Sequence, residues 1–215
     1  MSATDQETIR RIEDFHGHMC PGLAMGIRAA EVALECIGAH AADEEVVAIV
    51  ETDMCGVDAI QFLTGCTFGK GNLIHLDYGK NAYTFCRRSD GRAIRVTGKA
   101  RAWGGEDPEW QRLFTSVRGG GATPEEHRRF TTLHRARAER VLSAPIDDLY
   151  EVAKVDVEVP ARARIHTSLP CANCGENTME TRVRLLRGRQ LCPPCFEAEL
   201  AGRHPVAMRG APSST

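Results

Sequence analysis

The chain lacks long apolar runs, and none approaches the roughly 18 consecutive residues that a membrane-spanning helix needs. It also lacks a charge imbalance, because 27 Lys and Arg oppose 29 Asp and Glu, for a formal net charge of −2. Near-neutral charge disfavours nucleic acid and anionic membranes as the main partner. The first seven residues are polar and acidic, unlike a secretory signal. We therefore expect a cytoplasmic protein without a membrane partner.

Nine cysteines are present, and their odd number without a signal sequence favours a reducing compartment over a disulfide framework. Four of them form two Cys-x-x-Cys pairs near the C-terminus: Cys171, Cys174, Cys192 and Cys195. This spacing is typical of a four-cysteine zinc site, whereas a redox dithiol needs only one such pair. A closed four-cysteine site is structural and leaves no open position for chemistry. We therefore predict structural zinc here and look for the function elsewhere.

The periodicity of apolar residues predicts an α+β fold, with a mixed or antiparallel sheet packed against helices and a small C-terminal zinc-finger module. Helices are expected at 5–15, 21–38, 56–64, 108–117 and 123–142. Strands are expected at 46–50, 72–77, 81–87, 92–99 and 149–159. The expected domains are a metal-binding core at 1–160, a zinc finger at 161–202 and a disordered tail at 203–215.

A second set of potential metal ligands lies in three glycine-flanked clusters of the core. His16, His18 and Cys20 occur within five residues, Cys55 follows an expected strand, and Cys66 begins a glycine-rich loop. Cysteine and histidine are the usual ligands of soft and borderline metals. Cys20 also precedes an expected helix, whose positive end would lower its thiol pKa. These residues predict a second transition-metal site, with Cys20, Cys55 and His16 as catalytic candidates.

Two further features surround these clusters. Asp53 is expected to orient a metal-binding histidine through its second ring nitrogen. The loop containing Gly69, Lys70 and Gly71 is expected to face a small anionic ligand with its backbone N–H groups and its ammonium. It is not a nucleotide-binding P-loop, because Thr64 replaces the first glycine and Gly71 replaces the magnesium-binding hydroxyl residue.

These clusters resemble the FmdE family, which takes its name from formylmethanofuran dehydrogenase. The matching segments are His16 to Leu23 with Gly26-Ile27-Arg28, Glu51 to Cys55 with Asp58-Ala59-Ile60-Gln61, Gly65 to Leu73, and Asp77-Tyr78-Gly79-Lys80. The cysteine module is similar to the four-cysteine finger of the TraR/DksA type. The resemblance implies an α+β core, a homodimer and a metal in a pocket formed by the His/Cys clusters.

The sequence is compatible with several functions. The first is a metal-binding accessory protein that serves a molybdenum or tungsten oxidoreductase, or that handles metal or cofactor for one. The second is a stand-alone metal- or thiol-dependent enzyme for a small anionic substrate, with His16 or His18 as base. The third is a zinc-finger regulatory protein, which the finger's arginines favour and the near-neutral charge disfavours. The segment 104–145 has no assigned role.

Overall fold

The computed structural model describes residues 2–38, 45–100, 102 and 107–203. The chain divides into two compact units, Met1–Ala163 and Arg164–Thr215. Except for Arg203, the tail expected to be disordered lies outside the described residues. Among the residues that the structure describes, no helix is long and apolar enough to span a membrane.

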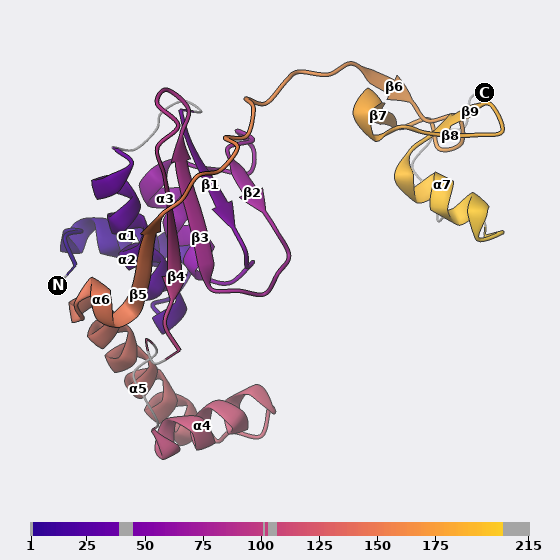
Figure 1. Ribbon diagram of the computed structural model, residues 1–215. Helices are drawn as coiled ribbons and strands as arrows, with labels where there is room; N and C mark the ends of the chain where they lie inside the picture. The colour runs from indigo at the N-terminus through magenta and orange to yellow at the C-terminus, as the bar shows by residue number, and fades with distance from the viewer. Residues whose placement is uncertain (1, 39–44, 101, 103–106, 204–215) are drawn as a thin grey trace. The chain divides into compact units, whose positions relative to one another are not determined.

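The first unit is built on a five-stranded mixed sheet, which confirms the predicted α+β class (Figure 1). Its strands are β1 (Val46–Val50), β2 (Leu73–His75), β3 (Ala82–Arg87), β4 (Ala93–Gly98) and β5 (Tyr150–Lys154). Their order is β2-β1-β3-β4-β5, with β1 and β2 parallel and the other neighbours antiparallel. Alternate strand residues point to one face, where the helices pack.

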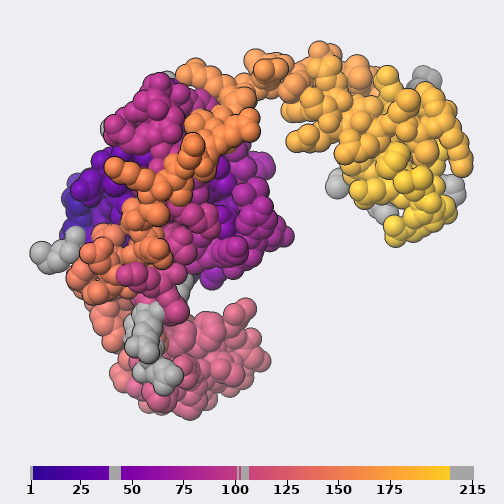
Figure 2. Space-filling model, viewed as in Figure 1, coloured from indigo at the N-terminus to yellow at the C-terminus, as the bar shows by residue number. Residues whose placement is uncertain are grey.

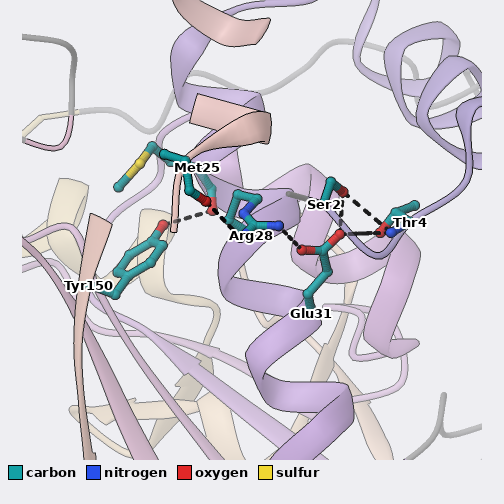
Figure 3. Close-up of polar contacts among 7 residues, drawn as sticks. Ser2, Thr4, Met25, Arg28, Glu31 and Tyr150 are labelled. Atoms are coloured by element: carbon teal, nitrogen blue, oxygen red, sulfur yellow. Dashed lines mark hydrogen bonds and ion pairs between the residues drawn. The ribbon is translucent and has the colours of Figure 1, made fainter. Parts of the chain in front are cut away.

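Helix α2 is the centre of the core. The helices of this unit are α1 (Gln6–His16), α2 (Pro21–Cys36), α3 (Gly56–Thr64), α4 (Pro108–Arg118), α5 (Pro124–Ser143) and α6 (Ile146–Leu149). Leu23 and Ile27 of α2 are fully buried with Phe85 of the sheet. The buried Tyr150 hydroxyl donates a hydrogen bond of 2.7 Å to the carbonyl of Met25, which joins β5 to α2 (Figure 3).

Two glycines set the closest approach of α2 and α3. A Cβ atom on Gly26 would lie 2.2 Å from the carbonyl oxygen of Gly56 and 2.4 Å from its Cα atom. Only glycine fits at such a backbone contact. Gly26 is in the second turn of α2 and Gly56 opens α3, so the crossing brings the N-termini of both helices together.

An ionic network attaches the N-terminal segment to the helices (Figure 3). Arg28 forms an ion pair of 2.6 Å with Glu31 and donates 3.0 Å to the carbonyl of Ala144, just after α5. Glu31 accepts hydrogen bonds from the hydroxyls of Ser2 and Thr4. Because both charged side chains are largely buried, this pairing is needed to offset their desolvation.

The segment to which the sequence assigned no role forms a helical hairpin of α4 and α5, which extends away from the sheet (Figure 1). Trp110 stacks on Phe114 at 4.8 Å, and the guanidinium of Arg137 lies 4.2 Å from the indole centroid. The indole N–H also donates 3.3 Å to Nδ1 of His134. One end of α5 packs on α2, and the hairpin is further stabilised by the aromatic cluster between α4 and α5.

The strand expected at 149–159 is wrong in its second half, because β5 ends at Lys154, opposite the start of β4. The chain continues as an extended segment across the outer face of the sheet, where Val155, Val157 and Val159 pack near Val47 and Cys86. Figure 2 shows this orange segment over the strands. The alternation of valines correctly indicated which side chains are partly buried. The pairing with β4 stops at Lys154, however, because β4 begins there.

The second unit is a small module of two hairpins and a helix. Its elements are β6 (Ser168–Pro170), β7 (Asn177–Met179), a 3₁₀ turn (Glu180–Arg182), β8 (Arg184–Leu186), β9 (Arg189–Leu191) and α7 (Pro193–Leu200). The fully buried Leu191 forms its small apolar core with Leu186 and Phe196. So little buried apolar area needs a metal or another staple for stability.

Candidate functional site

The four C-terminal cysteines converge on one point. The sulfur atoms of Cys171, Cys174, Cys192 and Cys195 all lie within 4.8 Å of one another. Two come from the turn after β6, one from the end of β9 and one from the first turn of α7. The backbone N–H of Cys192 donates 3.3 Å to the sulfur of Cys171. Burial opposes ionisation of Cys171, but backbone N–H groups of both cysteine turns outweigh it and lower its pKa to about 6.

The core holds a second convergence of potential ligands, among the residues described. Ligand atoms of His16, Cys20 and Cys55 lie within 4.8 Å of one another. His16 is the last residue of α1, and Cys20 and Cys55 are the N-cap residues of α2 and α3. Three helix ends therefore meet at this cluster, which we call the core cluster.

Glycines make room for the two thiols of the core cluster. A Cβ atom on Gly22 would lie 3.3 Å from the Cβ of Cys55 and 3.8 Å from the sulfur of Cys20. Gly17 ends α1 in the left-handed conformation at φ 96°, which favours glycine and turns the chain toward Cys20. The two glycines of this segment thus have distinct functions: Gly17 makes the turn after α1, and Gly22 leaves space for the two thiols.

The imidazole of His16 is oriented by a carboxylate. Its Nδ1 lies 2.6 Å from Oδ2 of Asp58, in the first turn of α3. Its Nε2 is buried and has no hydrogen-bond partner in the described part of the chain. Metal-binding histidines typically donate one ring N–H to a carboxylate and present the other nitrogen to the metal. A buried, unpaired nitrogen beside two thiols fits a metal ligand better than a structural histidine.

The carboxylate that orients His16 belongs to Asp58 and not, as the sequence predicted, to Asp53, which is exposed. The signal for Asp58 was its place three residues after Cys55, which puts it on the same face of α3 as the helix start. Which carboxylate faces His16 depends on how α1 docks on α3. That docking is a tertiary contact, which sequence spacing does not encode.

The thiol of Cys20 differs from the sequence expectation. Burial raises its pKa to about 11, and the neighbouring Cys55 adds to the increase, although the N–H of Leu23 donates 3.3 Å to the sulfur. Desolvation therefore outweighs the helix N-terminus, and the expectation of a lowered pKa is wrong. Without a bound metal, Cys20 is protonated at neutral pH.

Two predicted ligands are outside the core cluster. The ring of His18 lies 4.7 Å from that of His16, but His18 is exposed and is not one of the three converging ligands. Cys66 is fully buried and its thiol donates 3.4 Å to the carbonyl of Val46, at the start of β1. His18 thus borders the site, whereas Cys66 packs at the opposite end of β1.

The glycine-rich loop also lies away from the core cluster. The loop follows the C-terminal end of α3, whereas Cys55 lies at the N-terminal end. Helix α3 is about 13 Å long, at 1.5 Å per residue. The buried Asn72 closes the loop by donating 2.9 Å to the carbonyl of Val46 and accepting 2.9 Å from the N–H of Thr67. The anion site predicted at Gly69, Lys70 and Gly71 therefore concerns a different place in the fold.

The two clusters differ in what they can do. Four thiolates close a tetrahedral metal site, whereas one imidazole and two thiolates leave a fourth position for water or a ligand. The core cluster also has exposed apolar neighbours, Phe15 (58% exposed) and Met54 (56% exposed). Among the described residues, it is therefore the group of potential ligands that leaves a coordination position open.

Comparison with known proteins matches both units. The family model described as "FmdE, Molybdenum formylmethanofuran dehydrogenase operon" matches residues 15–151. The model described as "Prokaryotic dksA/traR C4-type zinc finger" matches residues 165–199, so the C-terminal module is a C4-type zinc finger.

A probable S-adenosyl-L-methionine-binding protein of Archaeoglobus fulgidus is 36% identical over 184 residues, which are 81% of this chain and 49% of the relative. The chain thus spans about half the length of this curated relative. The crystal structure of a tungsten formylmethanofuran dehydrogenase FmdE-like protein from Syntrophus aciditrophicus shares the fold. It has a TM-score of 0.58 and 24% identity, covering 89% of this chain and 91% of that chain. Because the first family model covers more than half of the sequence, the chain belongs to the FmdE family and carries a C4-type zinc finger after its core.

Proposed function

We propose that the core cluster binds one transition metal through Nε2 of His16 and the sulfur atoms of Cys20 and Cys55. The observation that carries the proposal is the buried Nε2, unpaired among the described residues, of a histidine whose Nδ1 is already bonded to Asp58. Two thiolates and an imidazole are a ligand set that suits zinc and other borderline or soft metals.

Each side chain has a distinct part in this site. Asp58 fixes the orientation of His16, so that Nε2 faces the metal position. Cys20 and Cys55 supply negative charge, and Cys20 must lose its proton when metal binds, so binding releases protons. When bound, the metal supplies Lewis acidity at its open position.

We further propose that the protein acts as a metal-binding accessory to a molybdenum or tungsten oxidoreductase of the formylmethanofuran dehydrogenase type. Membership of the FmdE family supports this partner class. The open position suits either metal transfer or a ligand shared with a partner. The same membership supports a homodimer. Sedimentation at micromolar concentration should give twice the chain mass of 23.6 kDa.

A second candidate function is the binding of a small molecule of the S-adenosyl-L-methionine class. The 36% identity to the Archaeoglobus fulgidus relative favours it. Calorimetric titration of the metal-loaded chain with S-adenosyl-L-methionine tests it, and absence of heat at millimolar ligand would exclude it. The same titration with Cys20→Ser shows whether the ligand uses the core cluster.

The metal site is tested with the full chain and cobalt(II) as a spectroscopic probe. Asp58→Asn should lower cobalt affinity about 10- to 100-fold, because the carboxylate no longer orients His16. His16→Ala should abolish the core spectrum and leave the finger's four-sulfur spectrum. Cys36→Ser, at the partly buried end of α2, is the matched control and should change neither. Unchanged cobalt binding in His16→Ala would overturn the assignment.

A further inference from the structure

The geometry of the core cluster points to a second chemistry: we propose that Cys20 and Cys55 form a reversible dithiol–disulfide pair that reacts with small-molecule disulfides. Formation of the bond expels the core metal. The metal release rests on the proposed function, whereas the thiol chemistry does not.

The two thiols are adjacent and have little between them. Their sulfur atoms lie within 4.8 Å, and both are within 3.8 Å of the position that a Gly22 side chain would occupy. Because Gly22 has no side chain, no Cβ atom crowds either sulfur on this side. A disulfide needs sulfur atoms about 2.05 Å apart and Cβ atoms about 3.5–4.5 Å apart.

A direct backbone contact between α2 and α3 keeps the two cysteines close together. Cys20 and Cys55 cap α2 and α3, and these helices touch through Gly26 and Gly56 at backbone distance. The two cysteines are therefore neighbours because of the fold, although 35 positions separate them in the sequence. They stay neighbours whether or not a metal links them.

The two thiols are not equivalent. Cys20 is 4% exposed and its sulfur accepts the N–H of Leu23, so it lies behind the surface. Cys55 is half-buried and follows Met54, whose side chain is exposed. A small disulfide therefore reaches Cys55 first, and Cys20 is placed to resolve the product.

The reaction balances with one equivalent of a small disulfide as oxidant. The Cys55 thiolate attacks one sulfur of the disulfide, forms a mixed disulfide and displaces one thiolate. The Cys20 sulfur, after losing its proton to solvent, attacks the Cys55 sulfur and displaces the second thiolate. The protein loses two electrons and two protons, and the oxidant becomes two thiols.

The product no longer offers the metal two thiolates. Thiolates, and not disulfide sulfurs, are the ligands of such metals, so His16 alone remains. Reduction by an excess of small thiol restores the dithiol and the binding site. The core cysteines Cys66 and Cys86 contrast with this pair, since both are fully buried and held in or beside the sheet.

The experiment uses the full chain and oxidised glutathione as probe, with and without prior metal removal by chelator. Linked peptides are mapped after denaturation and alkylation of free thiols. We expect a Cys20–Cys55 linkage in wild type and, from metal-loaded protein, loss of the core metal in step with it. Cys20→Ser should stop at a glutathione adduct on Cys55, whereas Cys55→Ser should give little adduct on Cys20. Cys36→Ser should behave as wild type.

The outcomes separate the two proposals. If metal-free wild type gives no Cys20–Cys55 linkage, or if Cys20→Ser carries no adduct on Cys55, the dithiol proposal is overturned. If the linkage forms but no core metal is ever bound, the dithiol chemistry stands and the proposed metal site fails. An adduct confined to the finger cysteines would also overturn the dithiol proposal.

Discussion

Replacing Gly26 with alanine tests whether the close crossing of α2 and α3 holds the core together. The added Cβ would lie 2.2 Å from the Gly56 carbonyl oxygen, where an ordinary contact begins at 3.4 Å. The two backbones must therefore separate by about 1.2 Å. Neither side can relax by rotating a side chain, because the obstructing atoms belong to the backbone.

The expected loss of stability in Gly26→Ala is the difference between two opposing effects. Overpacking a filled core costs about 1–3 kcal/mol, and a backbone obstacle places this case at the upper end. Alanine gains up to about 1 kcal/mol over glycine in a helix. A net loss of about 2 kcal/mol should lower the melting temperature by about 4–8 °C in a unit of this size.

The assay is thermal unfolding followed by helical circular dichroism, with Gly121→Ala as control. A Cβ at Gly121 meets no described atom within 4 Å, and its φ is not in the left-handed region, so this variant should melt within about 2 °C of wild type. Because separation of α2 from α3 also separates Cys20 from Cys55, Gly26→Ala should weaken core metal binding too. A melting temperature equal to that of Gly121→Ala would show that the close crossing of α2 and α3 does not hold the core together.

Three further predictions concern other parts of the chain. Cys174→Ser should remove the finger's zinc and make residues 164–203 protease-sensitive while the core melts as before, since structural zinc contributes on the order of 10 kcal/mol to small fingers; a protease-resistant finger would contradict this. The hydrogen bonds of Arg95 hold the pKa of Glu51 below its ordinary value of 4.5, so this pair's stabilisation is full above pH 4.5 and is lost as pH falls through the lower folded value. Urea titrations should show this acid loss reduced in Glu51→Gln, and an unchanged pH slope would count against the pair. Arg28→Met should lower the free energy of unfolding by about 3–5 kcal/mol, because it leaves the Glu31 carboxylate largely buried without its cation. A loss below about 1 kcal/mol in the same urea titrations would show that Glu31 needs no cation.

The helices and strands of the core could be predicted where a short sequence pattern determines them. Pro21 begins α2, the β-branched run at 46–50 is β1, and Thr123 caps α5 through a capping box. The four-cysteine finger was also readable, because its spacing alone defines the site. The end of β5 was not readable, because it depends on where the neighbouring strand begins.

The candidate site was predictable in its ligands and not in its geometry. Cysteine and histidine near helix ends signalled metal chemistry, and three of those residues do converge. The placement of Cys66 beside β1 and the role of Asp58 follow from the tertiary contacts of α3 with α1 and α2. The pKa of Cys20 likewise depends on burial by segments distant in the sequence, which no local pattern contains.

The metal content of Cys174→Ser in the full chain shows most directly whether the core cluster binds metal. This variant disables the finger, so any tightly bound metal belongs to the core cluster. We predict one equivalent of zinc or cobalt per chain in Cys174→Ser, and none when Cys20→Ser is added to it. Metal-free Cys174→Ser protein with an intact core melting transition would contradict the proposed metal site.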